Sequence, residues 1–166
     1  MVESSSVAGK GDRSSGRIER RLAELGIELP PVSAPVANYL GCKRVGDMLH
    51  VGGHGPVSKS GVIRGKVGKD VDLARGREAA RATALSMLAT VQAELGTLDR
   101  VRQVVKVFGM VNCAPGFNQT PAVIDGCSDV LVEVFGDLGR HTRSAVGMVE
   151  LPFDISVEIE MILQVE

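Results

Sequence analysis

The sequence predicts a single α+β domain in which two helices cover one face of a six-stranded sheet. Three observations lead to this class. Segments with strand character outnumber helical ones, the strands come in runs that two helices interrupt, and each helical segment has one apolar face. The chain has 166 residues, 44% hydrophobic and 23% charged, so it can bury one core of ordinary size.

The first 34 residues differ in composition from the rest of the chain. Residues 1–16 are rich in serine, glycine and charge, and we expect a disordered tail there. Residues 17–34 are expected to form a short helix followed by a connector with several prolines. Residues 35–166 form the predicted domain.

The domain begins with a predicted hairpin. One arm runs through Tyr39 and Cys42, the turn lies near Gly46, and the second arm covers 48–52. After a loop, the stretch VIRGKVG (62–68) is expected to form a third, short strand.

Two helices follow, separated by a strand. The first is predicted from Asp70, as its N-cap, to about Leu95, because apolar residues recur there at steps of three, four and seven. Gly96 is expected to end it. The second occupies TPAVIDGCSDVLVEVFG, with Thr120 as N-cap and Pro121 at the first helical position.

The remaining strands are apolar. One lies between the helices at 100–112, where β-branched residues dominate, and two lie in GRHTRSAVGMVELPFDISVEIEMI on either side of Leu151 and Pro152. In the last strand, valine, isoleucine, methionine and leucine alternate with Glu158 and Glu160. Because no further helix is available, we expect a partner subunit to cover the second face of the sheet.

Composition disfavours several classes of function. The formal net charge is −1 without a basic run, and the chain has four Phe, one Tyr and no Trp, which disfavours a nucleic acid partner. No apolar run could span a membrane, and the N-terminus has no apolar signal core, so we expect a cytoplasmic protein. Three scattered cysteines and three scattered histidines give neither a disulfide framework nor a metal site.

Arg143 is the most informative polar residue, because it stands at the start of an otherwise apolar strand. A guanidinium there offers a rigid fork of donors that suits a carboxylate. We expect its strand to neighbour the one that carries Glu158, so that both side chains share a surface and the glutamate can activate water. The residues leave an alternative open, a salt bridge between Arg143 and a glutamate at a subunit interface.

RSAVGMVELPFDISVEIEMI resembles the C-terminal signature of the RidA/YjgF family, and VGDMLHVGGHGPV is similar to its N-terminal hairpin. The resemblance covers about residues 35–165. It implies a chorismate-mutase-like fold and a homotrimer with a cleft at each subunit interface. It also implies hydrolysis of reactive enamines and imines, such as 2-aminoacrylate, to 2-keto acids and ammonia, without a metal or an organic cofactor.

The resemblance also implies roles for single residues. Arg143 corresponds to the arginine that holds the substrate carboxylate, and Glu158 to the glutamate that positions water. Tyr39 would line the cleft, and Gly53 corresponds to a glycine of the hairpin turn. His54 stands where the family often has glutamine, and it is read either as a cleft residue or as an exposed loop histidine.

Two positions depart from the family pattern. Ala145 replaces a small thiol, and Asp125 stands where asparagine is expected. An aspartate near a carboxylate site would repel the substrate unless it were paired. Two functions therefore stay open, a deaminase and a protein that binds small carboxylates without fast turnover. A ribonuclease, as some relatives were once described, fits the charge and the few aromatics least.

Overall fold

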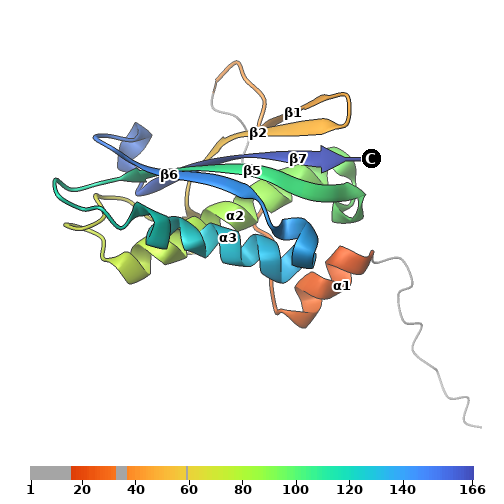
Figure 1. Cartoon of the computed structure of the whole chain (residues 1–166), viewed down its shortest axis with the longest axis horizontal. Helices are drawn as coiled ribbons and strands as arrows, with labels where there is room; N and C mark the ends of the chain where they lie inside the picture. The colour runs from red at the N-terminus through yellow and green to blue at the C-terminus, as the bar shows by residue number, and fades with distance from the viewer. Residues whose placement is uncertain (1–15, 33–36, 59) are drawn as a thin grey trace, which may run out of the picture.

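The computed structural model describes residues 16–32, 37–58 and 60–166 (Figure 1). Apart from Gly16, the predicted tail at 1–16 lies outside the described residues. The main sheet has five strands in the order β1-β2-β7-β5-β6. Their bounds are β1 Cys42–Val45, β2 Met48–His54, β5 Val101–Asn112, β6 Thr142–Met148 and β7 Val157–Val165. All neighbours pair antiparallel except β5 and β6, which are parallel.

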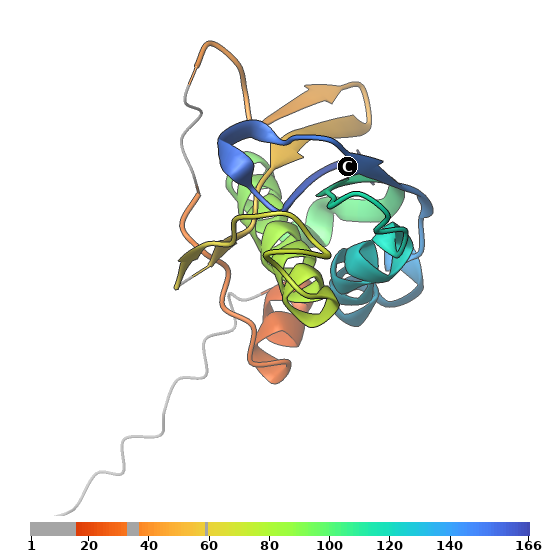
Figure 2. The ribbon, with the colours of Figure 1, turned by 90° about the vertical axis from the view of Figure 1, so that its left-hand side faces the viewer.

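Helices lie on one side of this sheet, as Figures 1 and 2 show. They are α1 (Arg17–Glu24), α2 (Leu73–Leu95) and α3 (Thr120–Phe135). The predicted α+β class is therefore confirmed, with α2 and α3 as the two long helices. Short 3-10 turns follow α2 (η1, Leu98–Arg100), α3 (η2, Gly136–Gly139) and β6 (η3, Pro152–Asp154).

The prediction of a six-stranded sheet is wrong. The third predicted strand does not join the main sheet, and a separate pair forms from β3 (Val57–Ser58) and β4 (Gly61–Val62). Gly65 and Gly68 have φ angles of +104° and +93°, which turn the chain within the expected strand. Val67 forms only isolated bridges there.

Both predicted N-caps are displaced. α2 is capped by Asp72, whose side chain accepts a hydrogen bond from the Arg75 amide at 2.7 Å. Asp70 instead accepts from the Lys66 amide at 3.1 Å and closes the preceding turn. Gln119 precedes α3, and Thr120 is already helical. The helix ends at Gly96 and Gly136 agree with the prediction.

The core lies between the sheet and the pair α2 and α3. Along β7 the five residues that face the helices are all buried, as the alternation predicted: Val157, Ile159, Met161, Leu163 and Val165. The two helices approach closely at Gly126, where a Cβ atom would lie only 2.1 Å from the Arg77 carbonyl oxygen. Glycine at that point therefore fixes how α2 sits against α3.

α1 packs on its own chain. Asp99 of η1 accepts hydrogen bonds from the amides of Arg17 at 2.6 Å and Ile18 at 3.0 Å, and so acts as its cap. Ile18 and Leu22 are buried in the core.

The other face of the sheet carries no α-helix among the described residues (Figure 1). We call it the open face. The β5–β7 and β5–β6 registers place on it Phe108, Met110, Ser144, Val146, Glu158, Glu160 and Ile162. Coverage of this face by a partner subunit stays a prediction. No described helix has the length and apolar character that a membrane span needs.

Candidate functional site

Arg143 lies on the edge strand β6 and faces the helices. Its partner in the β5 register is Val107, a buried residue of the helix-covered face. Its Nη1 atom donates to Asp125 Oδ1 at 2.8 Å and to Ser128 Oγ at 3.0 Å, both on α3. Its Nη2 and Nε atoms have no partner among the described residues. One edge of the guanidinium is thus available for two parallel hydrogen bonds.

Ser128 links Arg143 to His141. The serine oxygen lies 3.1 Å from His141 Nε2, and the other ring nitrogen lies 2.7 Å from the carbonyl oxygen of Gly139. Burial lowers the pKa of His141, and the charge of Arg143 lowers it further. A neutral ring that donates from Nδ1 to Gly139 accepts from the Ser128 hydroxyl. Arg143 and His141 therefore hold the serine from two sides.

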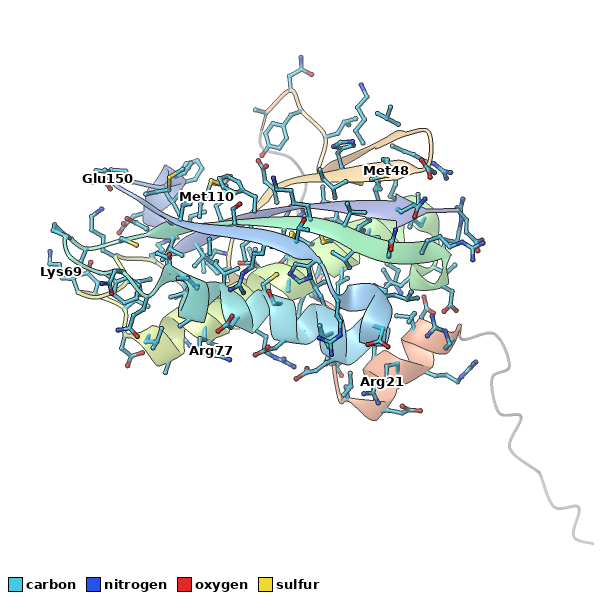
Figure 3. The ribbon with its side chains drawn as sticks, viewed as in Figure 1. Arg21, Met48, Lys69, Arg77, Met110 and Glu150 are labelled. Atoms are coloured by element: carbon cyan, nitrogen blue, oxygen red, sulfur yellow. The ribbon has the colours of Figure 1, made fainter. Side chains whose placement is uncertain are left out.

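Asp125 also faces a second arginine, Arg77 of α2. The distance from its Oδ2 to Arg77 Nη1 is 3.6 Å, and Arg77 Nη2 donates to Asp129 Oδ2 at 2.8 Å. Figure 3 shows Arg77 in the helix layer. Cys127 is fully buried, and burial raises its thiol pKa to about 12, so this thiol is inert.

Ala145 follows Arg143 by two residues on the same side of β6. It lies opposite Gly109 in the register, and its carbonyl accepts a hydrogen bond from Thr120 Oγ1 at 3.0 Å. The structure thus brings Arg143, Asp125 and Ala145 together with Ser128. We call these four residues the arginine half-site.

Glu158 and Gly53 meet at the junction of β7 and β2. A Cβ atom on Gly53 would lie 2.0 Å from Glu158 Oε1, so the carboxylate occupies the space that a side chain would need. Burial raises the pKa of Glu158, and the neighbouring charge of Glu160 raises it further. Among the described residues Glu158 has no hydrogen bond or ion pair.

The family resemblance implied that Gly53 lies in a hairpin turn, and the structure shows that it does not. It lies inside β2, where the register with β7 shifts between Val51 and His54. That irregularity brings the glycine backbone against Glu158. The hairpin turn itself is at Gly46, as predicted.

Tyr39 is 55% exposed in the segment that leads into β1. The residues that follow Tyr39 lie beside the end of β2, because the Gly52 amide donates a hydrogen bond to the Gly41 carbonyl at 3.0 Å. Tyr39 therefore lies at the same end of the hairpin as Gly53, and no hydrogen bond joins it to Glu158 among the described residues. We call Glu158, Gly53 and Tyr39 the glutamate half-site.

His54 is neither exposed nor in a loop. It ends β2, and its ring faces α2, with Nε2 2.8 Å from Thr90 Oγ1 and Nδ1 2.8 Å from the Gly52 carbonyl oxygen. Burial lowers its pKa. The ring thus points to the helix layer, while Glu158 points to the open face.

A single chain does not bring the two half-sites together. The expectation that the strands of Arg143 and Glu158 are neighbours is wrong, because β5 lies between β6 and β7. The side chains also point to opposite faces, since Arg143 pairs with Val107 and Glu158 with Met110. In Figure 3, Met110 lies above the sheet and Arg77 below it.

Sequence reasoning missed Ser128 and Arg77. Ser128 follows Asp125 by three residues in a predicted helix, so the helical period could have placed it beside Arg143. Arg77 could not have been found that way, because its place depends on the crossing of α2 and α3.

A hollow of about 570 Å³ lies on the open face, under the segment before β1. Lys43, His50, Lys106, Phe108 and Glu160 are among its lining residues, whereas Arg143 and Glu158 are not. The described part of the chain has no group of three or more histidine, cysteine, aspartate or glutamate side chains that could hold a metal ion. The hollow adjoins the glutamate half-site through Leu40, Gly52 and Glu160, although no residue of either half-site lines it.

Residues 19–160 match the profile of the family described as "YjgF/chorismate mutase-like, putative endoribonuclease". Protein TCP17 of Trypanosoma cruzi is 41% identical over 153 residues, which cover 91% of this chain and 96% of the relative. A crystal structure of a protein of unknown function from Agrobacterium tumefaciens is 42% identical with a TM-score of 0.83, over 90% of this chain and 92% of that one.

More distant structures share the fold. E. coli TdcF, solved with bound serine, is 20% identical with a TM-score of 0.58, over 81% of this chain and 94% of that one. The α+β architecture, the match to the family profile and these relatives agree with the resemblance seen in the sequence. The chain belongs to the YjgF/RidA family and has its chorismate-mutase-like fold.

Proposed function

We propose that the protein hydrolyses small 2-enamino and 2-imino acids to 2-keto acids and ammonia. The reaction takes place where the arginine half-site of one subunit meets the glutamate half-site of another in a homotrimer. One observation carries this proposal: Arg143 and Glu158 lie on opposite faces of the sheet in one chain. A second copy can supply the missing half.

In this proposal the free edge of Arg143, formed by Nε and Nη2, donates two hydrogen bonds to the substrate carboxylate. An enamine first gains a proton on C3 and becomes an iminium. Water then adds to C2 while Glu158 takes its proton. The same proton passes to the nitrogen, and Glu158 takes the proton of the C2 hydroxyl as ammonia leaves and C2 becomes a carbonyl. Glu158 then releases this proton to solvent, which balances the proton gained on C3, and one water is consumed for each ammonia released.

The environment of Glu158 suits this exchange of protons. Burial raises its pKa, and the neighbouring charge of Glu160 raises it further. A carboxylate with a raised pKa is a stronger base and accepts a proton from water more readily. The serine bound to TdcF is a small ligand with a carboxylate and a nitrogen, which is the kind of ligand proposed here.

The test is a coupled assay in which a serine or threonine dehydratase generates the enamine and keto-acid formation is followed. We expect the protein to accelerate keto-acid release, and Arg143→Ala to lose this effect by on the order of a hundredfold, because a buried charge contact to the substrate is removed. Full activity of Arg143→Ala would contradict the carboxylate role.

Arg140→Ala is the matched control. Arg140 lies three residues before Arg143, its side chain is 73% exposed, and it pairs with Asp137 rather than with a residue of the arginine half-site. Its loss is expected to leave the rate unchanged.

A second candidate function is binding of small carboxylates without fast turnover. The hydrogen bond from Arg143 to Asp125 favours it, because a charge that is already compensated attracts a substrate less strongly. Calorimetric binding of pyruvate that is lost in Arg143→Ala, together with no acceleration of imine hydrolysis, would decide for this function.

A further inference from the structure

We infer that Arg77 is a positioning residue for the carboxylate site of Arg143: it holds and neutralises Asp125, so that a substrate carboxylate can bind beside this aspartate. The inference rests on the proposed role of Arg143 in binding a carboxylate. It assigns a specificity role to a residue of α2 that lies outside both half-sites.

Asp125 stands between two guanidinium groups. Its Oδ1 accepts from Arg143 Nη1 at 2.8 Å, and its Oδ2 faces Arg77 Nη1 at 3.6 Å. A ligand carboxylate on the free edge of Arg143 would share that guanidinium with Asp125. Two carboxylates on one guanidinium repel each other unless a second cation compensates.

Arg77 is fixed where that cation is needed. Its backbone lies at the α2–α3 crossing, against Gly126. Its side chain donates to the Ala122 carbonyl at 3.2 Å and to Asp129 at 2.8 Å. The anchors come before and after Asp125 along α3, so the guanidinium is held over this carboxylate.

The charges show what Arg77 contributes. Arg77 and Arg143 balance Asp125 and Asp129, and His141 is neutral because its pKa is lowered. Without Arg77 the same cluster keeps two carboxylates and one guanidinium, a net charge of −1. That excess would lie beside the site that must receive an anion.

An ordinary ion pair between helices is the competing explanation, and the chain offers a matched control for it. Arg81 of α2 pairs with Glu133 of α3 at 3.1 Å. The exposed fractions are 41% and 44%, against 42% and 42% for Arg77 and Asp125. The Arg81 pair has no contact with Arg143 among the described residues, so its loss reports only on helix packing.

The test is calorimetric binding of pyruvate to the whole protein. We expect Arg77→Gln to weaken binding about three- to tenfold, whereas Arg81→Gln leaves it unchanged and Arg77→Lys keeps near-normal affinity. In an Asp125→Asn background, Arg77→Gln should have a much smaller effect, because the carboxylate that shares the Arg143 guanidinium is gone and Asp129, which is left to Arg77, has no hydrogen bond to Arg143. A purely structural role would predict the same loss in both backgrounds.

The outcomes separate this inference from the proposed function. Loss of affinity that depends on Asp125, in a protein that does not accelerate imine hydrolysis, supports the role of Arg77 and removes the deaminase. Deaminase activity with equal pyruvate affinity in Arg77→Gln and the unmodified protein overturns the inference alone. A protein that binds no pyruvate and does not accelerate imine hydrolysis overturns both.

Discussion

The two half-sites differ in whether their charged side chains are paired within one chain. In the arginine half-site, Arg143 donates to Asp125 and Ser128, and Arg77 of the same chain faces Asp125 from outside the half-site. In the glutamate half-site, Glu158 is partly buried beside a second carboxylate, with no cation partner among the described residues. In the described part of the chain, the arginine half-site offers a free guanidinium edge and the glutamate half-site an unpaired carboxylate, as expected of a site shared between subunits.

The surroundings of the two half-sites support the same view. Arg143 belongs to the edge strand β6, and Glu158 to the open face of the sheet. Edge strands and open faces are the parts of a sheet that a single chain leaves unprotected. A neighbouring copy that covers them would also desolvate the ligand between them.

Of the substitutions that separate the two half-sites, Gly53→Ala is expected to lower the deaminase rate most. A methyl group there would lie 2.0 Å from Glu158 Oε1, so the carboxylate must move. The glutamate side chain is flexible, so we expect the fold to persist while deaminase activity falls about tenfold or more, because catalysis depends on the position of the carboxylate. The coupled assay measures the rate, and thermal unfolding measures stability.

Gly52→Ala is the control for this substitution. The atom nearest to a Cβ on Gly52 is a carbonyl oxygen at 3.7 Å, an ordinary contact. It should change the rate little. Equal losses for the two glycines would show that the strand, rather than the carboxylate, had been disturbed.

A smaller effect is expected from Glu160→Gln, which should shift the pH dependence of kcat/KM. Glu158 must be ionised to take a proton from water, so activity falls on the acid side as this group is protonated. Burial raises its pKa first and Glu160 second. Removal of the second charge lowers the pKa, and the acid limb of kcat/KM moves to lower pH by less than about one unit.

Glu150→Gln is the control for this pH profile. Glu150 lies in the segment between β6 and β7 and pairs with Lys66, not with Glu158. Its acid limb should coincide with that of the unmodified protein. An acid limb of Glu160→Gln that stays in place, or moves to higher pH, would exclude Glu158 as the group that controls it.

Much of the fold could be predicted from the sequence, because its signals are local. The hairpin turn at Gly46, the helix ends at Gly96 and Gly136, and the alternation along β7 all follow from residue type and period. The predicted third strand failed because Gly65 and Gly68 turn a segment whose β-branched residues, Val62, Ile63 and Val67, favour a strand.

The candidate site was predictable only in part, for the same reason. The alternation along the last strand predicted which face carries Glu158, and the position of Arg143 at the start of an apolar strand marked it as a site residue. Sequence order could not show that β5 enters between β6 and β7, nor that Arg77 reaches Asp125 across a helix crossing. Contacts between distant segments therefore decided the arrangement of both half-sites.

The central claim is that Arg143 and Glu158 act from different subunits, and co-expression of two inactive variants tests it most directly. Arg143→Ala and Glu158→Gln subunits would carry different tags, so that mixed oligomers can be purified. Each alone should be inactive, whereas purified mixed trimers should regain about a third of normal activity, because one of the three interfaces then combines an intact arginine with an intact glutamate. Mixed oligomers that remain inactive would contradict the shared site.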